Sequence, residues 1–470
     1  MRSSPIVFDL VIQGGTLITA SEQFEADLAF LDGKIAAIGT QLRGHETVDA
    51  RGQLVLPGAV DVHVHLEMPV GATVSSDDWQ RGTVAAAHGG TTTVVDFVEP
   101  EPEESLLEAY QKRRRQAEGR AAIDFGLHMT LLRADAETLS QVSDVSAEGL
   151  TSFKLYTTYE GLCLNDMELL AALRAIRDVD GLAIVHAEND ALIQWFTQEF
   201  TQAGLTSPRY HPRSRPGPAE GEAIERVLAL AEAVSATLYV VHVSTARGSA
   251  AVARARARGQ LAFGETCPQY LLLSDEVYER PDFEGAKFVC SPPLRTPDDN
   301  RALWLALGAG GLQTVATDHC PFNFAGQKDL GRGSFVEIPG GLPGLEARLA
   351  LLHTFGVCQG HLSLSRWVDV CCTTPARLFG LYPRKGTLLP GSDGDVVIFD
   401  PEYKLTLSQS TLHENVDYTP YAGMELCGYP RTTIARGETL VQEGRYVGSP
   451  GGGRFLRRGQ PNLQRGGAYA

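Results

Sequence analysis

Basic residues are too few in this chain to build a surface for polyanions. Among 470 residues, 41 are Lys or Arg and 57 are Asp or Glu, so the formal net charge is -16. Binding to nucleic acid or to an anionic membrane surface needs concentrated positive charge. The composition therefore argues against nucleic-acid and membrane partners and favours a small-molecule partner.

Long apolar runs and paired cysteines are also missing. No stretch approaches the roughly 20 consecutive apolar residues that a membrane span requires, because polar residues or glycines interrupt each apolar run. The eight cysteines form no C-x-x-C pair, and no basic segment followed by an apolar stretch opens the chain. We therefore expect a reduced, cytoplasmic protein whose 43% apolar content buries a large core.

Both ends of the chain carry the pattern of small antiparallel strands, with short apolar runs separated by Gly-containing turns. These runs lie at 8–12, 26–31, 34–38, 53–56, 394–399 and 431–440. We expect residues 1–57 and 385–447 to build one small β-sandwich. Residues 448–470 are rich in Gly and Arg without an apolar period and are predicted to be a tail.

Between the two ends, apolar β-rich runs alternate with helical stretches, which is typical of repeated βα units. Eight runs are predicted as strands: 54–65, 91–97, 123–131, 151–157, 182–186, 237–243, 261–265 and 312–318. Helix-start signals at Ser76-Asp77-Asp78 and Asn165-Asp166 support this alternation. Residues 58–384 are therefore predicted to form a (β/α)8 barrel of the α/β class, with its active site at the carboxyl ends of the strands.

The first predicted barrel strand ends in two histidines, His63 and His65. Residues two apart on a strand point to the same face, so both imidazoles can reach one ion. Neutral imidazole is a good zinc ligand. A single histidine near a strand end is more often a hydrogen-bonded core residue, but a pair on one face favours a metal site.

Lys154 ends the fourth predicted strand, within Ser152-Phe153-Lys154-Leu155-Tyr156. Phe153 and Leu155 fit an alternating strand and set Lys154 on the opposite face, toward the barrel interior. A lysine there is costly unless it is neutralised or modified. Reaction with carbon dioxide would give a carbamate whose two oxygens can bridge two metal ions. The alternative is a surface lysine on a wrongly assigned strand.

Three more predicted strands carry an ionisable residue near their ends, namely His186, His242 and Asp318. Together with His63, His65 and Lys154 they form a set that one shared metal site explains. Two metals about 3.5 to 4 Å apart in such sites acidify a shared water and polarise a carbonyl. Asp96, His128 and Glu265 also lie near strand ends, but no partner spacing marks them, so we expect structural or supporting roles.

The run Gly58-Ala59-Val60-Asp61-Val62-His63-Val64-His65 resembles the first-strand signature of the amidohydrolase superfamily. Leu66-Glu67-Met68-Pro69 and Gly89-Gly90-Thr91-Thr92-Thr93 look like the hydantoinases and dihydropyrimidinases within it. Further similar segments include Glu265-Thr266-Cys267-Pro268-Gln269-Tyr270 and Cys290-Ser291-Pro292-Pro293-Leu294-Arg295, and Tyr418 to Gly428 extends the match into the C-terminal region. The resemblance covers nearly the whole chain.

This resemblance implies a binuclear-metal cyclic amidohydrolase that opens hydantoins or 5,6-dihydropyrimidines to N-carbamoyl amino acids. His63 and His65 would hold one divalent metal with Asp318, His186 and His242 the other, and carboxylated Lys154 would bridge them. Zinc is expected, with manganese or cobalt as alternatives. A bridging hydroxide would attack the ring amide carbon. Asp318 would move its proton to the leaving nitrogen, and Tyr159 would donate a hydrogen bond to the oxyanion.

The resemblance also implies how the ring is held. The main chain of Ser291 and Gly340 would grip its imide-like edge, although Gly340 in Ile338-Pro339-Gly340-Gly341 replaces a more usual Asn. Val70, Tyr156 and Cys163 map onto the pocket for the ring substituent. Cys163 is smaller than the aromatic residue common there, which predicts tolerance of bulky substituents. The family further implies a homotetramer in which the tail, with Arg454, Arg457 and Arg458, reaches a neighbouring subunit.

Three other functions remain open at this point. Allantoinases and dihydroorotases share the metal ligands, although Met68-Pro69, Tyr159 and Cys290-Ser291-Pro292-Pro293 favour a hydantoinase. A non-catalytic scaffold of the collapsin response mediator type has lost metal ligands, whereas every ligand position is filled here. Metal storage is disfavoured by the closed barrel and by the acid/base candidate Asp318.

Overall fold

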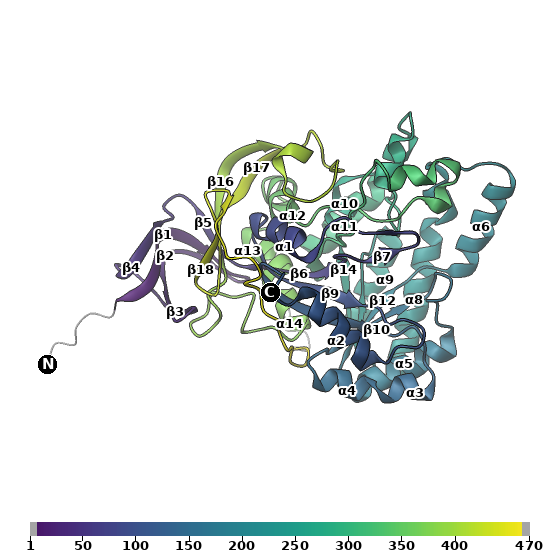
Figure 1. Ribbon diagram of the computed structural model, residues 1–470, viewed down its shortest axis with the longest axis horizontal. Coiled ribbons are helices and arrows are strands. Elements are labelled where there is room, and N and C mark those ends of the chain that lie inside the picture. Colours follow the sequence, from purple (N-terminus) through teal and green to yellow (C-terminus); the bar gives the residue numbers. More distant parts are fainter. Residues whose placement is uncertain (1–6, 463–470) are drawn as a thin grey trace.

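The central part of the chain alternates parallel strands with helices, and eight of those strands form one sheet in the order β15-β14-β13-β12-β11-β10-β9-β6 (Figure 1). A bridge between Val64 and His319 joins the two edges of this sheet. The predicted (β/α)8 barrel is therefore confirmed in this computed structural model, which describes residues 7–462. Its strands are β6 (Ala59–Val64), β9 (Thr91–Val98), β10 (Asp124–Thr130), β11 (Ser152–Tyr156), β12 (Leu182–His186), β13 (Leu238–Val240), β14 (Ala262–Thr266) and β15 (Thr314–Val315).

Helices surround the barrel, and both predicted helix starts are confirmed. The Asp78 side chain accepts a hydrogen bond from the Arg81 N–H at the start of α1, and Asn165 forms a capping box with Glu168 at the start of α5. None of the helices within 7–462 has the length and apolar character needed to cross a bilayer. The α-helices are α1 (Trp79–His88), α2 (Leu106–Ala117), α3 (Ala136–Ser140), α4 (Val142–Ala147), α5 (Asp166–Asp178), α6 (Asp190–Gln202), α7 (Tyr210–Ser214), α8 (Gly217–Val234), α9 (Ala246–Ala257), α10 (Pro268–Leu272), α11 (Pro297–Gly308), α12 (Arg348–Leu352), α13 (Leu364–Val368) and α14 (Thr374–Leu378).

A second sheet combines both ends of the chain, as the sequence predicts. Its path is β19-β18-β17-β16-β5-β1-β2-β3, with β4 paired to β1, so the C-terminal β16 lies beside the N-terminal β5. β1 pairs in parallel with β4 and β5, so the expectation of purely antiparallel strands is wrong. The strands are β1 (Phe8–Ile18), β2 (Gln23–Leu31), β3 (Lys34–Gly39), β4 (Gly44–Asp49), β5 (Leu54–Pro57), β16 (Val396–Thr406), β17 (Glu425–Ala435), β18 (Glu438–Gln442) and β19 (Arg445–Tyr446).

The predicted strand 54–65 is in fact two strands that belong to different sheets. β5 pairs with β1 and β16, whereas β6 pairs with β9 of the barrel. Gly58 lies between them, and a Cβ at this position would stand 2.2 Å from the Thr92 hydroxyl oxygen. Only glycine fits this close approach, so the chain turns from one sheet into the other at Gly58.

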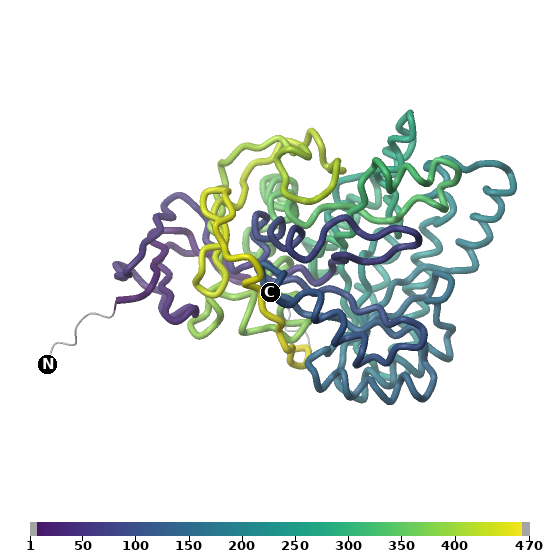
Figure 2. Tube along the Cα trace, in the orientation of Figure 1, coloured from purple at the N-terminus to yellow at the C-terminus, as the bar shows by residue number. Residues whose placement is uncertain are grey.

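The C-terminal segment after β19 packs along the chain's own barrel (Figure 2). The Phe125 N–H of β10 donates to the Arg454 carbonyl, and the Phe125 carbonyl accepts the Leu456 N–H. Leu456 is buried among side chains of the barrel interior. Arg458 is buried and donates to the Leu127 carbonyl, while Arg457 lies 3.3 Å from Glu148. The predicted tail therefore closes the barrel near the start of β10 instead of extending freely, and residues 463–470 lie outside the described part.

Candidate active site at the carboxyl ends of the strands

His63, His65 and Asp318 converge at the end of β6. The Nε2 atoms of His63 and His65 each lie 3.1 Å from the same oxygen of Asp318, Oδ1. Both histidines are nearly inaccessible to solvent. The possible ligand atoms of these three side chains all lie within 4.8 Å of one another, so the structure brings together the first half of the predicted set.

His186 and His242 form the second half, opposite the first. Their ring centroids are 4.6 Å apart, and the His242 ring is 5.5 Å from that of His63. The Nε2 atom of His186 is 2.8 Å from Glu188, which leaves Nδ1 as the ring's other nitrogen. The His242 ring has a buried Nδ1 without a hydrogen-bond partner. All four imidazoles thus keep a nitrogen that is not used in structural hydrogen bonding.

Lys154 lies between these two pairs, on the interior face of β11. Its side chain is almost fully buried, and its Nζ sits 5.2 Å from the ring centre of Phe97 and 5.1 Å from that of Tyr156. Phe97 in turn contacts the rings of His63 and His65. Burial lowers the pKa of the Lys154 ammonium to about 8. The predicted inward orientation is confirmed, and the alternative of a surface lysine is excluded.

Two buried carboxylates, Glu265 and Glu188, contact ring nitrogens of His63 and His186 and orient these rings. Glu265 lies 2.7 Å from His63 Nδ1 and also accepts hydrogen bonds from the Tyr239 hydroxyl and the His242 main-chain N–H. Burial raises the pKa of Glu265 to about 7. Burial acts in the same direction on Glu188, but the Arg215 guanidinium 2.6 Å away outweighs it and lowers the pKa of that carboxyl to about 2. Such carboxylate–histidine pairs fix the tautomer and ring orientation of metal-ligating imidazoles.

The other two residues given supporting roles act on the main chain around this site. Asp96 accepts a hydrogen bond from the Leu66 N–H and pairs with Arg113. His128 bonds to the Ser152 hydroxyl and the Val62 carbonyl, directly before His63. Both are buried, so they stabilise the strand ends that carry His63 and His65.

Three of the predicted site residues have backbone conformations that side chains rarely adopt. Tyr159, His242 and Asp318 have φ values of 78°, 39° and 52°. Strained backbone conformations of this kind are kept only where the surrounding structure enforces them, and they cluster at functional sites. His242 and Asp318 follow β13 and β15, which end earlier than predicted, at Val240 and Val315. The backbone therefore turns before each side chain is presented to the site.

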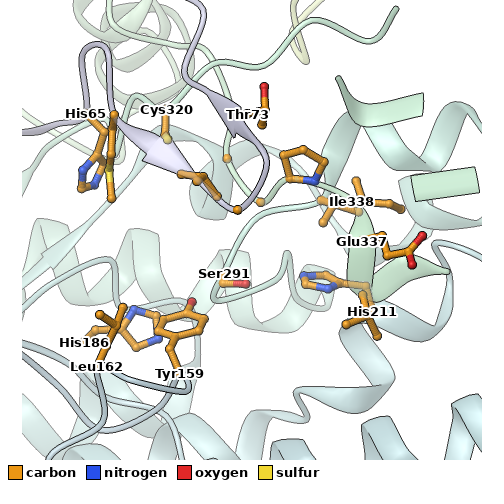
Figure 3. Close-up of a pocket in the computed structure, with 18 of the residues that line it drawn as sticks. His65, Thr73, Tyr159, Leu162, His186, His211, Ser291, Cys320, Glu337 and Ile338 are labelled. Carbon is orange, nitrogen blue, oxygen red and sulfur yellow. The ribbon is translucent and has the colours of Figure 1, made fainter. Parts of the chain in front are cut away.

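A cavity of about 960 Å³ lies at this end of the barrel (Figure 3). All six proposed metal ligands line it, namely His63, His65, Lys154, His186, His242 and Asp318. In the close-up Tyr159 and His186 lie together, and Ser291 stands beside Tyr159. Val70, Tyr156 and Gly340 also line the cavity, as the resemblance implies. Cys163 does not line it, because the turn after Tyr159 directs Leu162 inward and leaves Cys163 exposed. The small size of Cys163 therefore does not enlarge this cavity.

The glycine at position 340 is not required by lack of space. A Cβ built on Gly340 would meet its nearest atom, the Ser291 hydroxyl oxygen, at 3.8 Å. Gly341 differs, since a Cβ there would stand 2.3 Å from the Cys320 carbonyl oxygen and its φ is 153°. Position 340 therefore has room for a Cβ, whereas position 341 requires glycine.

Several residues of this site carry no sequence pattern that marks them. Arg215 lies in a polar segment before α8, and its position against Glu188 depends on distant parts of the chain. Glu99 follows β9 and accepts a hydrogen bond from the Tyr156 hydroxyl inside the cavity. A carboxylate two residues after a predicted barrel strand was the only available signal for Glu99.

Comparisons with known proteins agree with this geometry. A family model described as the Amidohydrolase family matches residues 54–440. D-hydantoinase of Streptomyces coelicolor is 45% identical over 456 residues, which cover 95% of this chain and 97% of the relative. D-phenylhydantoinase of Escherichia coli is 43% identical over 96% of this chain and 98% of its own length. The chain belongs to the amidohydrolase family, in its hydantoinase and dihydropyrimidinase group.

Solved structures of this group superpose closely on the amidohydrolase chain. The dihydropyrimidinase from Brevibacillus agri matches with a TM-score of 0.94 at 44% identity and covers 96% of this chain and 98% of its own. L-hydantoinase from Arthrobacter aurescens matches with a TM-score of 0.88 at 31% identity. The predicted family and the predicted combination of barrel and outer sheet are therefore both confirmed.

Proposed function

We propose that this amidohydrolase hydrolyses the ring amide of hydantoins and 5,6-dihydropyrimidines and releases N-carbamoyl amino acids. The observation that carries the proposal is the common 3.1 Å distance from His63 and His65 to one oxygen of Asp318, at the floor of a large cavity. The similarity to D-hydantoinases and to a dihydropyrimidinase over nearly the whole chain supports the choice of substrate.

The donor set fits two divalent metal ions. His63, His65 and Asp318 can hold one ion, and His186 with His242 can hold the other, since each imidazole has a free nitrogen. Imidazole and carboxylate ligands suit zinc first, and manganese or cobalt as alternatives. When bound, such ions lower the pKa of water and polarise a carbonyl group.

Lys154 is proposed to carry a carboxylate formed from carbon dioxide, which would join the two ion sites. The neutral amine adds carbon dioxide and loses one proton, giving a carbamate with two oxygen donors. Its depressed pKa makes the neutral amine accessible near pH 8. No Asp or Glu oxygen of the described chain lies within 4.0 Å of Nζ. A buried ammonium is costly even with the charges of Asp318, Glu265 and Glu99 nearby, and the carbamate would replace it with an anion that bound metal ions would neutralise.

Asp318 is proposed to accept the proton from the attacking water and to deliver it to the leaving ring nitrogen. Burial alone would raise the pKa of this carboxyl, but the adjacent His63 and the hydrogen-bonded His65 outweigh burial and lower it. The group is therefore a carboxylate at neutral pH and can take a proton. It lies at the cavity floor, where a ring amide would enter.

Tyr159 is proposed to stabilise the negative charge that develops on the amide oxygen. Burial raises the pKa of its hydroxyl to about 12, so the group stays protonated and can donate a hydrogen bond. Ser291 stands beside it in the cavity. The main chain of Ser291 and Gly340 would bind the opposite, imide-like edge of the ring, since both line the cavity.

The ring substituent is proposed to occupy the outer, largely apolar part of the cavity. The apolar residues that line the cavity include Val70, Leu162, Ile193, Leu330, Phe335, Val336 and Ile338, and Tyr156 lies nearer the candidate metal site, beside Lys154. The size of this space supports aryl-substituted hydantoins, in keeping with the D-phenylhydantoinase among the relatives. Cys163→Phe should leave the ratio of turnover between phenyl-substituted and unsubstituted hydantoin unchanged, because Cys163 lies outside the cavity.

A substrate panel on protein of known metal content tests the proposal. Hydantoin, a 5-phenyl hydantoin and dihydrouracil should be opened, with the N-carbamoyl product identified by mass. Faster opening of allantoin or dihydroorotate would instead assign one of those activities. A preparation that binds no zinc or manganese and opens none of these rings would indicate a scaffold protein.

Two further features stay predictions. We propose a cytoplasmic protein, supported by eight cysteines that all carry free thiols. We also propose a homotetramer, for which the family resemblance is the support. Arg458 is buried against the chain's own barrel, whereas Arg454 and Arg457 are exposed, so contact of the tail with a neighbouring subunit stays a prediction.

A further inference from the structure

Lys328 is a fully buried lysine in the segment that connects β15 to α12. It begins the short 3-10 helix η3 (Lys328–Gly333), and none of its surface is exposed. Its Nζ donates hydrogen bonds of 2.9 Å to the carbonyl oxygens of Val289 and Pro339. Within 7–462 no carboxylate pairs with this ammonium. Burying a cation that only carbonyl groups contact costs free energy. We therefore expect the buried Lys328 to have a specific role.

Both carbonyls belong to the main-chain segments proposed to bind the ring. Val289 lies two residues before Ser291, and Pro339 directly precedes Gly340. The Val289 carbonyl also accepts the Gly341 N–H at 3.0 Å, so these segments are already neighbours. Lys328 adds the second connection between them. Burial lowers the pKa of Lys328 to about 7, but a neutral amine still has two N–H groups for these two acceptors.

Gln327, the preceding residue, holds a third segment that lines the cavity. Its amide nitrogen donates to the Thr73 hydroxyl at 2.7 Å and to the Val74 carbonyl at 2.8 Å. The amide oxygen accepts the Asn323 N–H, which orients the group. Thr73 and Val74 form β8 of the hairpin with β7 (Pro69–Val70), and this hairpin covers one side of the cavity.

We propose that Gln327 and Lys328 are positioning residues for the substrate, with separate tasks. Lys328 fixes the main-chain groups at Ser291 and Gly340 that hold the imide edge of the ring. Gln327 fixes the β7–β8 hairpin that contacts the ring substituent. The inference rests on the proposed function, because that function supplies the ring and its orientation.

The two proposed roles predict kinetic effects that a general destabilisation of the protein would not produce. Every substrate ring shares the imide edge, so loss of the Lys328 contacts weakens binding of substituted and unsubstituted rings alike. The hairpin meets only a substituent, so loss of the Gln327 contacts discriminates between them. Interactions equally strong in the ground and transition states change KM with little change in kcat.

The experiment compares Lys328→Met and Gln327→Met in the metal-loaded enzyme, using hydantoin and 5-phenyl hydantoin. Lys328→Met is expected to raise KM for both substrates at least about tenfold, with kcat within about threefold of wild type. Gln327→Met should lower kcat/KM about tenfold for the phenyl substrate and less than about twofold for hydantoin. Lys328→Arg, which keeps N–H donors, should recover part of the KM.

Two matched controls separate positioning from folding. Lys287→Met removes a lysine whose Nζ pairs with Glu284, and Gln260→Met removes an amide that donates to the distant Leu228 carbonyl. Both should retain wild-type KM for both substrates. Metal content and thermal midpoint are measured for every variant, so that a loss of folded or loaded protein is recognised.

The outcomes distinguish the inference from the function beneath it. If Lys328→Met keeps the wild-type KM, or if both variants affect both substrates equally, the separate positioning roles are wrong although the enzyme opens rings. If loaded wild-type protein opens neither substrate, the proposed function itself fails. Should Lys328→Met not accumulate as folded protein, Lys328→Gln is measured against the same KM criterion.

Discussion

Glu265 contacts both halves of the candidate metal site. Its Oε1 atom lies 2.7 Å from His63 Nδ1 and 3.1 Å from the main-chain nitrogen of His242. One buried carboxylate therefore sets the tautomer of a proposed ligand in the first ion site and the backbone of a ligand in the second. The protein thus connects the two candidate ion sites independently of the proposed bridge through Lys154.

We predict that Glu265→Gln weakens metal binding about 10- to 100-fold, because the amide no longer fixes the His63 ring as a charged acceptor does. Zinc titration of metal-free protein, followed calorimetrically, gives the affinity. Asp369→Asn is the matched control, since Asp369 is also a buried carboxylate and accepts hydrogen bonds from Arg366 and the Thr374 hydroxyl away from the cavity. Equal affinities in Glu265→Gln and wild type would contradict the supporting role.

The pKa of Lys154 predicts a pH dependence for loading. Only the neutral amine reacts with carbon dioxide, and this form is the minor one below pH 8. At constant dissolved carbon dioxide and zinc, reactivation of metal-free enzyme should therefore accelerate about tenfold per pH unit from pH 6 to 8 and level off above. Stopped samples assayed over time give the rate. A rate that is flat between pH 6 and 8 would show that the amine is not the reacting group.

Tyr159→Phe removes one hydrogen-bond donor and leaves the ring of the side chain in place. Turnover is expected to fall by roughly two to three orders of magnitude, as loss of one oxyanion donor does in other enzymes. Metal content should stay at the wild-type level, because no proposed ligand changes. Steady-state kinetics with hydantoin measures the effect, and an unchanged kcat removes Tyr159 from the mechanism.

Adjacent glycines should respond oppositely to substitution. Gly340→Asn restores the residue more usual in the family and meets no atom closer than 3.8 Å from its Cβ, so kcat/KM should change less than about threefold. Gly341→Ala forces a Cβ against the Cys320 carbonyl at a φ that L residues rarely adopt, so ring binding should fail. If Gly340→Asn abolishes activity while Gly341→Ala is tolerated, the described course of this main chain is wrong.

The sequence predicted those parts of the molecule that depend on local periodicity. His63, Lys154 and His186 lie on barrel strands where the sequence predicts strands, and His65 directly follows its strand, because the alternation of these strands is readable. The strand 54–65 was not divided, since a continuous apolar run does not reveal that Gly58 approaches Thr92. The polar, exposed β4 escaped prediction for lack of an apolar pattern.

Residues that act through tertiary contacts could not be found in this way. Lys328 stands in the polar run Gln327-Lys328-Asp329, which reads as a solvent-exposed turn. Its burial arises because carbonyls from Val289 and Pro339, 39 and 11 residues away, meet at its Nζ. Cys163, which the resemblance maps onto the substituent pocket, is exposed, and the neighbouring Leu162 lines the cavity.

Stepwise addition of zinc to metal-free protein, with ring opening of hydantoin assayed at each addition, tests the central claim most directly. Two ion sites built from His63, His65, Asp318, His186, His242 and Lys154 predict that N-carbamoyl product appears with added zinc. They also predict that activity saturates at about two equivalents per chain. Full activity in metal-free protein, or no ring opening at two bound equivalents, would contradict the account.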